Sequence, residues 1–139
     1  MNAYAIGDLA PGVSESFTVE VTAEMLERFR ELSGDVNPLH CDEEFARSRG
    51  YKGRVAYGML AASLYSTLAG VYLPGRDCLL HEVDVKFKKP VFIGDTLTVT
   101  GVVRDVSAAL GRVEIEGKTV NQDGVTVNKA VIQAGVLAR

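Results

Sequence analysis

Several features that would place a protein in a specialised class are missing from this sequence. Its two cysteines, Cys41 and Cys78, are too few for a disulfide framework, so a reduced, cytoplasmic setting is expected. Its formal net charge of −3 at pH 7 lacks the basic excess of a dedicated nucleic-acid-binding protein. The opening residues, MNAYAIGDLAPG, show no cationic start followed by an apolar block, so no secretory signal is predicted.

Charge is absent between Arg54 and Arg76. The stretch between them, VAYGMLAASLYSTLAGVYLPG, matches a membrane span in length. It is interrupted by glycine, serine, threonine and proline and is only moderately apolar, which favours a helix buried in a globular core. We therefore expect no association with a membrane. The sequence also lacks the phosphate-binding glycine loop and the G-x-S-x-G turn of serine hydrolases.

The composition that is present is that of an ordinary globular domain. Of the 139 residues, 47% are hydrophobic and 24% are charged. A chain of this length forms one core and buries roughly two-thirds of the surface that it exposes when unfolded. We predict a single domain over residues 1–139 that folds without a metal or a disulfide.

Hydrophobic periodicity predicts the order of the elements. Thr22 is a good N-cap for a helix over residues 23–33, which Gly34 ends, and Asp42 caps a short helix, EEFARS. The uncharged stretch predicts one long helix over about residues 58–72. Alternating patterns predict strands over residues 16–21, 79–89, 95–104, 112–120 and 125–137.

Consecutive strands joined by short turns favour an antiparallel sheet, so the predicted fold class is α+β. One face of such a sheet needs cover, and the long helix is apolar or small nearly all round. The sheet is therefore expected to curl around the helix. Because one small sheet cannot cover that helix completely, we also predict a dimer.

The run D-V-N-P-L-H over residues 35–40 carries the candidate chemistry. Pro38 forces Asn37 out of the helical region, so the run is predicted to be a loop. A carboxylate and an imidazole on one ordered loop, here Asp35 and His40, can share a water molecule. One group then accepts a proton from the water while the other delivers a proton elsewhere. On spacing alone a structural role is more common, in which Asp35 and Asn37 merely bond their own turns.

Two further groups could contact a substrate. Gly58 begins the uncharged helix, where unpaired N–H groups and the missing side chain would let the backbone polarise a carbonyl oxygen. Arg54 and Lys88, each with basic neighbours, could meet the phosphates of a nucleotide-like carrier. Helix packing for the glycine and a solvated surface for the cations are the simpler explanations.

Three stretches together carry a specific resemblance. They are FRELSGDVNPLHCDEEFA, GRVAYGMLAASLYSTLAG and VKFKKPVFIGDTLTV, and they resemble the MaoC-like, R-specific enoyl-CoA hydratases from about residue 20 to about residue 105. The D-x-N-P-x-H loop combined with the G-M-L-x-x-S helix start is more specific than either alone. The resemblance implies a hot-dog fold and a homodimer joined edge to edge through its sheets. It also implies reversible addition of water to a trans-2-enoyl thioester, giving the R-3-hydroxyacyl product.

The resemblance also implies a role for individual residues. Asp35 and His40 match the pair that holds and activates one water molecule, and Asn37 matches the asparagine of the motif. Gly58 matches the backbone donor to the thioester carbonyl, and Ser63 matches a serine that supports the carboxylate by hydrogen bonding. The substrate would be an acyl thioester of coenzyme A or of a carrier protein. No metal, flavin or nicotinamide is implied.

One position departs from the family pattern. Members often have His before the Gly-Met pair, whereas this chain has Tyr57, which can donate a hydrogen bond but does not titrate near neutral pH. Tyr57 is therefore a candidate substrate contact, and the substrate preference stays open.

Two alternative functions also stay open. One is a hot-dog acyl-CoA thioesterase, although residues 55–75 hold no Asp or Glu. The other is a non-catalytic acyl-thioester-binding protein.

Overall fold

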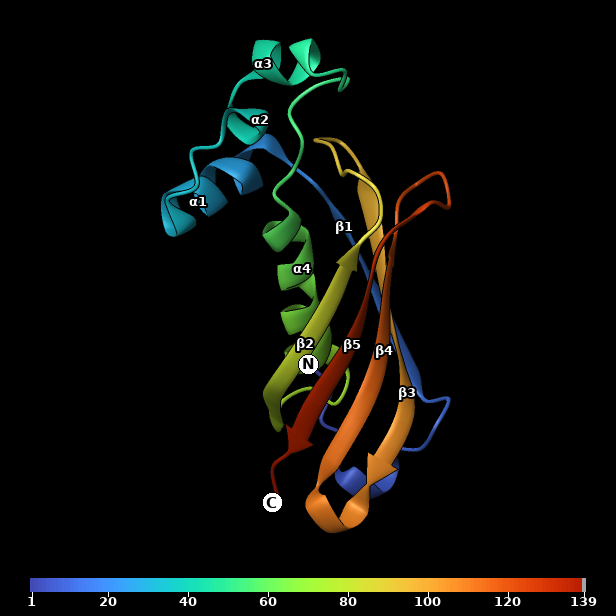
Figure 1. Cartoon of the computed structure of the whole chain (residues 1–139). Helices are drawn as coiled ribbons and strands as arrows, with labels where there is room; N and C mark the ends of the chain where they lie inside the picture. The colour runs from blue at the N-terminus through green and yellow to red at the C-terminus, as the bar shows by residue number, and fades with distance from the viewer. Residues whose placement is uncertain (139) are drawn as a thin grey trace.

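A five-stranded antiparallel sheet curves around one helix in the computed structural model, which describes residues 1–138 (Figure 1). The strands are β1 (Ser14–Glu20), β2 (Cys78–Phe87), β3 (Thr96–Ser107), β4 (Arg112–Val120) and β5 (Thr126–Val136). They lie in the order β1-β3-β4-β5-β2, so β1 and β2 form the two edges of the sheet. The predicted α+β class and the wrapped helix are confirmed.

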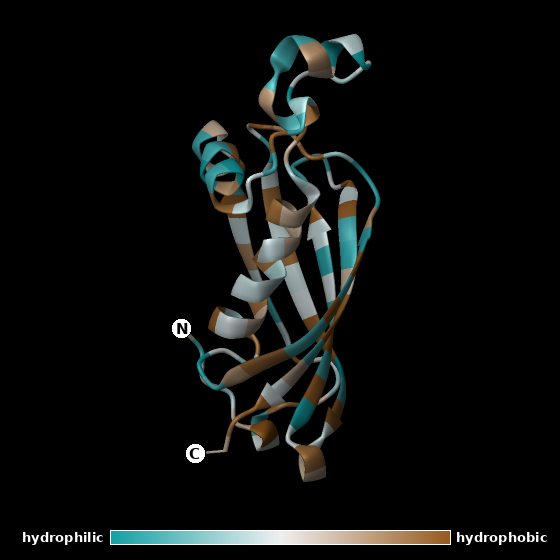
Figure 2. Cartoon of the chain, turned by 60° about the vertical axis from the view of Figure 1, so that its left-hand side comes forward, coloured by the Kyte–Doolittle hydropathy of each residue, from teal (hydrophilic) through white to brown (hydrophobic). Residues whose placement is uncertain are grey.

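The wrapped helix is α4 (Gly58–Thr67), and it runs on into a π-helical turn, η2 (Leu68–Tyr72). The prediction of one helix over residues 58–72 is right in extent but wrong for the wider last turn. Figure 2 shows α4, coloured pale to brown, lying along the hollow of the sheet. Its sheet-facing side is buried at Ala61 and Tyr65, and the opposite side is exposed at Met59.

Two paired glycines let the sheet approach this helix closely. Gly101 of β3 lies opposite Gly117 of β4 in the register. A Cβ atom at Gly117 would lie 2.5 Å from the Tyr65 ring, and one at Gly101 would lie 2.7 Å from the Leu68 side chain. The sheet can therefore pack against α4 and η2 here only because both positions lack a side chain.

Three short helices gather beyond the N-terminal end of α4: α1 (Ala23–Ser33), α2 (Pro38–Cys41) and α3 (Glu43–Ser48) (Figure 1). The predicted caps are confirmed, because Thr22 Oγ1 accepts from the Met25 N–H at 3.2 Å and Asp42 Oδ1 accepts from the Phe45 N–H at 3.0 Å. The prediction that residues 35–40 are all loop is wrong, since His40 lies in α2. Pro38 is the first residue of that turn, where its missing N–H costs nothing.

Buried side chains form two clusters. The larger lies between the sheet and the end of the wrapped helix, around Tyr65 and Leu68. The smaller lies under the three short helices and includes Leu26, Tyr57 and Leu97. This second cluster anchors the segment that carries Asp35 and His40. In the described part of the chain no helix is long and apolar enough to cross a membrane.

Candidate active site

Asp35 lies in the turn between α1 and α2. Its Oδ1 accepts a hydrogen bond from the Asn37 N–H at 3.0 Å, and Asn37 Oδ1 accepts one from the Leu39 N–H at 2.9 Å. Asn37 is thereby the N-cap of α2. Within residues 1–138 no group donates to the second carboxylate oxygen of Asp35, Oδ2. The structural role and the chemical role of Asp35 are therefore compatible, because they use different oxygens.

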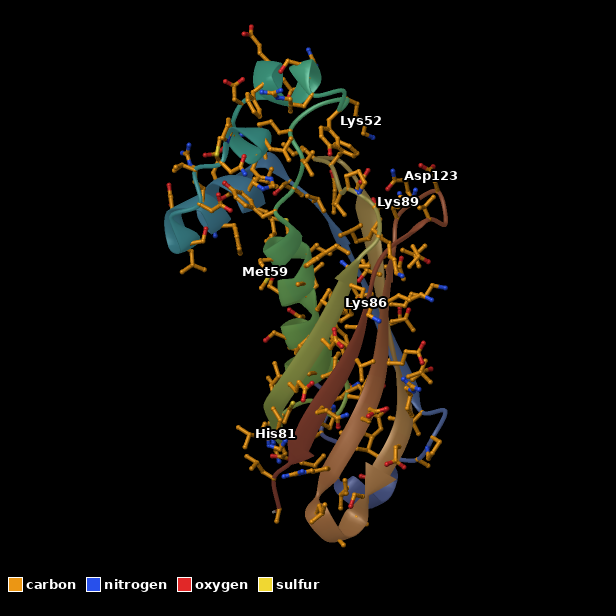
Figure 3. The ribbon with its side chains drawn as sticks, in the orientation of Figure 1. Lys52, Met59, His81, Lys86, Lys89 and Asp123 are labelled. Carbon is orange, nitrogen blue, oxygen red and sulfur yellow. The ribbon has the colours of Figure 1, made fainter. Side chains whose placement is uncertain are left out.

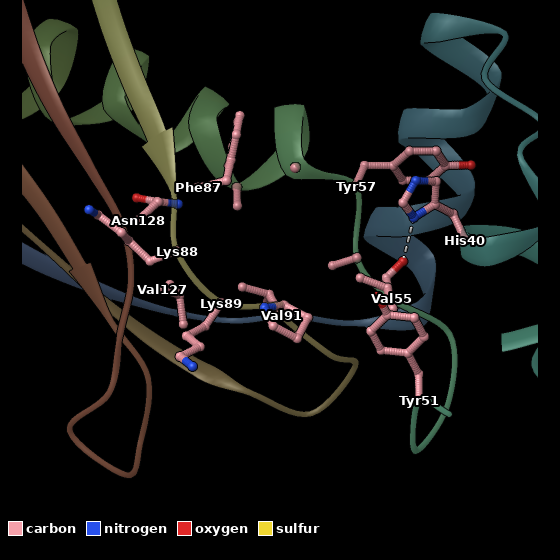
Figure 4. A pocket seen from close by; sticks show the side chains of 14 residues that line it. His40, Tyr51, Val55, Tyr57, Phe87, Lys88, Lys89, Val91, Val127 and Asn128 are labelled. Carbon is pink, nitrogen blue, oxygen red and sulfur yellow. Dashed lines mark hydrogen bonds between the residues drawn. The ribbon is translucent and has the colours of Figure 1, made fainter. Parts of the chain in front are cut away.

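His40 is held by its Nδ1 atom, which lies 2.7 Å from the Val55 carbonyl oxygen (Figure 4). A carbonyl oxygen only accepts, so Nδ1 carries a proton in this arrangement. In the neutral imidazole the other nitrogen, Nε2, is then unprotonated and can accept a proton. The bond to Val55 thus selects the tautomer that a general base needs.

Tyr57 connects the two candidate residues. Its hydroxyl donates to the backbone carbonyl of Asp35 at 2.7 Å, and its ring lies 4.2 Å from the His40 ring between centroids. The side chain is buried, with 2% of its surface exposed. The prediction that Tyr57 contacts the substrate needs one correction. Its hydroxyl proton is already donated to the Asp35 carbonyl, so only the Tyr57 ring can form part of the wall of a binding site.

Burial and a hydrogen bond with Cys41 raise the pKa of Tyr57 well above its ordinary value of 10.0. The Tyr57 hydroxyl therefore stays protonated in the folded protein at pH values where an unfolded tyrosine ionises. Above pH 10 the unfolded chain binds fewer protons than the folded chain at this residue. The free energy of unfolding must consequently fall as the pH rises through this range.

We predict that Tyr57→Phe lowers the free energy of unfolding by about 1 kcal/mol at pH 7, the value of one hydrogen bond. It should also flatten the loss of stability between pH 10 and pH 12. Urea denaturation at a series of pH values measures both effects. Tyr51→Phe, at an exposed position, serves as the matched control. An alkaline slope that is identical in Tyr57→Phe and the native protein would contradict the raised pKa of Tyr57.

Gly58 is the first residue of α4, where a backbone N–H has no partner inside the helix. No other bond from this N–H is found within the described residues. A Cβ atom here would lie 3.3 Å from Cε1 of Phe87. The missing side chain therefore keeps the helix tip open on the side where Phe87 stands.

Two adjoining cavities meet at this tip. The first, which we call the loop cavity, has a volume of about 280 Å³ and is lined by Asp35, His40, Gly58 and neighbouring apolar side chains. The second, which we call the sheet cavity, has a volume of about 320 Å³ and lies between α4 and the sheet. Both are lined by His40, Tyr57, Gly58 and Phe87. The predicted catalytic pair and the glycine that carries the predicted backbone donor thus all line the loop cavity.

The structure places the three other predicted site residues, Ser63, Arg54 and Lys88, in different surroundings. Ser63 is corrected: its hydroxyl donates to the Leu60 carbonyl at 2.6 Å on the outer side of α4, so it does not support Asp35. Arg54 forms an ion pair with Glu27 at 2.8 Å and lines neither cavity. Lys88 does line the sheet cavity.

Asn128 of β5 was missed by the sequence reasoning and also lines the sheet cavity. Asn128 lies on a strand of alternating residues and belongs to no recognisable motif. Its place in the cavity wall follows only from the pairing of β5 with β2 and from the position of α4.

Comparison with known proteins decides the family. The family profile described as "MaoC like domain" matches residues 10–128. The chain belongs to the MaoC-like family. This MaoC-like chain is 37% identical over 123 residues to an (R)-specific enoyl-CoA hydratase of Rhodospirillum rubrum, a match that covers 80% of the chain and 85% of the relative. It is 44% identical over 70 residues to an (R)-specific enoyl-CoA hydratase of Aeromonas caviae, a match that covers 50% of the chain and 52% of the relative.

A solved R-hydratase from Pseudomonas aeruginosa has the same fold. It superposes with a TM-score of 0.92 at 28% sequence identity, covering 97% of this chain and 86% of that one. The MaoC-like chain therefore adopts the hot-dog fold, and the resemblance found from its motifs is confirmed.

Proposed function

We propose that this MaoC-like protein adds water reversibly to trans-2-enoyl thioesters and forms R-3-hydroxyacyl thioesters. The observation that carries the proposal is the shared cavity into which Asp35, His40 and the Gly58 N–H open. This is the set of groups that hydration needs: a base for water, a carboxylate to orient it, and a donor for the oxygen that gains charge. The curated relatives named as hydratases and dehydratases support it.

Each group has a definite step. The Asp35 carboxylate holds the water through Oδ2, and His40 Nε2 takes a proton from it as the water oxygen bonds to C3 of the substrate. The double-bond electrons move toward the thioester, and the resulting enolate oxygen accepts a hydrogen bond from the Gly58 N–H. The imidazolium then returns its proton to C2. The hydroxide of the water is thus added to C3 and its proton to C2. His40 returns to its starting protonation state, and the reaction needs no cofactor.

The assay that tests this function uses trans-2-enoyl-CoAs of graded chain length, with loss of the enoyl absorbance and the chirality of the product both measured. We expect the R-3-hydroxyacyl product. Release of free thiol without hydration would instead assign a thioesterase, and acyl-CoA binding without turnover would assign a binding protein. The binding-protein alternative rests on Tyr57 standing where members of the family often have His, and the turnover assay decides it.

We also propose that the protein works as a homodimer paired through β2. This strand is an edge of the sheet, so its outer backbone groups are available to a second copy. Its side chains include the exposed apolar residues Leu79, Leu80 and Phe87. An apolar edge strand of this kind is the arrangement that favours pairing between chains.

Sedimentation equilibrium tests the dimer. We expect a mass of twice the 15.0 kDa of one chain, and a shift toward the monomer in Leu80→Asp. Leu110→Asp makes the same change outside β2, in the turn between β3 and β4, and should leave the mass unchanged. A monomeric native protein would sink the proposal.

A further inference from the structure

A network of buried polar groups lies between α4 and the sheet, next to the sheet cavity. The Tyr65 hydroxyl donates to Asn128 Oδ1 at 2.5 Å, and the Thr119 hydroxyl donates to the Tyr65 oxygen at 3.1 Å. All three residues are buried, and Asn128 is 1% exposed. Placing polar side chains in a core is costly unless their hydrogen bonds are made, so this arrangement needs a reason.

The network fixes the orientation of the Asn128 amide. Because the Tyr65 hydroxyl accepts from Thr119, its own proton goes to Oδ1 of Asn128, which leaves Nδ2 on the other side. No acceptor for Nδ2 exists within residues 1–138, and no fully buried side-chain nitrogen or oxygen in that range lacks a partner. Nδ2 must therefore reach the sheet cavity, which Asn128 lines.

The position of this amide relative to the helix tip is set by strand pairing. Asn128 lies opposite Phe87 in the β2–β5 register, and the Phe87 ring borders Gly58. Figure 4 draws Asn128 beside Phe87 and Lys88. The Asn128 amide and the Gly58 N–H are thus two donors that face the same cavity from the sheet and from the helix.

We propose that Asn128 is a substrate-positioning residue whose Nδ2 donates to an amide carbonyl of the pantetheine arm, which coenzyme A and carrier proteins share. This inference rests on the proposed function, since it takes the thioester carbonyl to lie at Gly58. The first pantetheine amide is a few bonds from the thioester sulfur, so a donor next to Gly58 is in the right region. Asn128 makes no contact with the reacting atoms and acts by placing them.

The lining of the two cavities decides which end of the substrate meets Asn128. The loop cavity offers Phe29, Met59 and the face of Phe87, which suit an acyl chain. The sheet cavity also has Lys88 and Lys89 in its wall, and both are exposed cations that suit the phosphates at the far end of a pantetheine arm. Figure 3 shows Lys89 at the end of the sheet nearest the three short helices, past the end of β2. The arm therefore runs through the sheet cavity and the acyl chain through the loop cavity.

Two crotonyl thioesters separate the proposal from a merely structural role. The N-acetylcysteamine thioester keeps the first pantetheine amide, and an S-alkyl thioester of equal length lacks it. We expect Asn128→Ala to lower kcat/KM about tenfold for the N-acetylcysteamine thioester and for crotonyl-CoA, the loss of one neutral hydrogen bond. The S-alkyl thioester should be turned over by this variant at nearly the native rate.

Thr119→Val is the matched control, because it removes the hydroxyl at the other end of the network while the Tyr65 hydroxyl can still donate to Asn128 Oδ1 and leave Nδ2 free. We expect it to lower stability but to retain the native preference between the two thioesters. If Asn128→Ala does not fold, Asn128→Ser replaces it, because serine keeps a polar group in the core but is too short to donate to the substrate as the amide does. Equal losses on both thioesters in the folded variant, or no preference for the amide thioester in the native protein, would overturn the proposal.

Binding of pantetheine itself keeps this inference separate from the proposed function. We expect the Kd of pantetheine, followed by NMR titration, to rise about tenfold in Asn128→Ala compared with the native protein. That result would uphold the Asn128 contact even if no enoyl thioester were hydrated. An unchanged Kd in a protein that does hydrate enoyl-CoA would refute the contact and leave the proposed function standing.

Discussion

Replacing Asp35 with Asn, or His40 with Asn, should each reduce kcat for hydration of crotonyl-CoA by about 10²–10⁴-fold, the range contributed by positioned acid–base groups. Both changes are designed to spare the local structure. An asparagine at position 35 still offers an oxygen to the Asn37 N–H, which Asp35 Oδ1 accepts at present. An asparagine at position 40 can place its amide nitrogen near the present Nδ1 and still donate to the Val55 carbonyl. What each variant loses is the ionisable group.

The matched control is Asp42→Asn, which makes the same chemical change at the N-cap of α3, outside both cavities. Asparagine caps a helix about as well as aspartate, so activity and melting temperature should both stay close to native. Initial rates and thermal melting of the three variants are measured together. Full turnover in the Asp35 or the His40 variant would end the assignment of these residues as the acid–base pair.

The parts of the fold that the sequence predicted are those fixed by neighbouring residues. Thr22 and Asp42 cap their helices through atoms three residues away, and Gly34 ends α1 with φ at 74°, a conformation that favours glycine. The strands likewise follow from alternation. The expectation that Pro38 forces Asn37 out of the helical region is confirmed, with ψ of Asn37 at 124°. The single turn α2 is missed because the first position of a helix accepts proline, so a helix can begin at Pro38 itself.

The parts of the site that escaped prediction depend on distant contacts. Ser63 has the spacing of the family serine, yet the outward rotation of its side chain on α4 aims the hydroxyl at the Leu60 carbonyl. The Tyr57 hydroxyl reaches the Asp35 carbonyl across 22 residues of sequence, and the Tyr65 hydroxyl reaches Asn128 across 63. A pattern of neighbouring residues cannot predict hydrogen bonds between residues that are so far apart in the sequence. The segment that carries Asp35 and His40 was recognisable because its residues are close in sequence, whereas the groups that hold it in place are not.

Replacing Gly58 with Pro should lower kcat by about 10²–10³-fold, the effect of removing one donor from an oxyanion site. Proline is the one residue that deletes the backbone N–H, and here the fold can accept it. Position 58 begins α4, where proline fits a helix, and Tyr57 before it has φ −58° and ψ 129°, the extended conformation that a residue before proline prefers.

Gly58→Ala is the control that makes this experiment decisive. Alanine adds a Cβ atom at the same place, 3.3 Å from Cε1 of Phe87, but it keeps the N–H. Phe87 is 54% exposed, so its ring can shift by the few tenths of an ångström required, and we expect only a small loss of activity in this variant. The two variants therefore share the added Cβ atom, whereas proline alone loses the N–H and adds the Cγ and Cδ atoms of its ring. If their kcat values fall equally, the helix tip contributes space and not a hydrogen bond, and the enolate must be stabilised from elsewhere in the cavity.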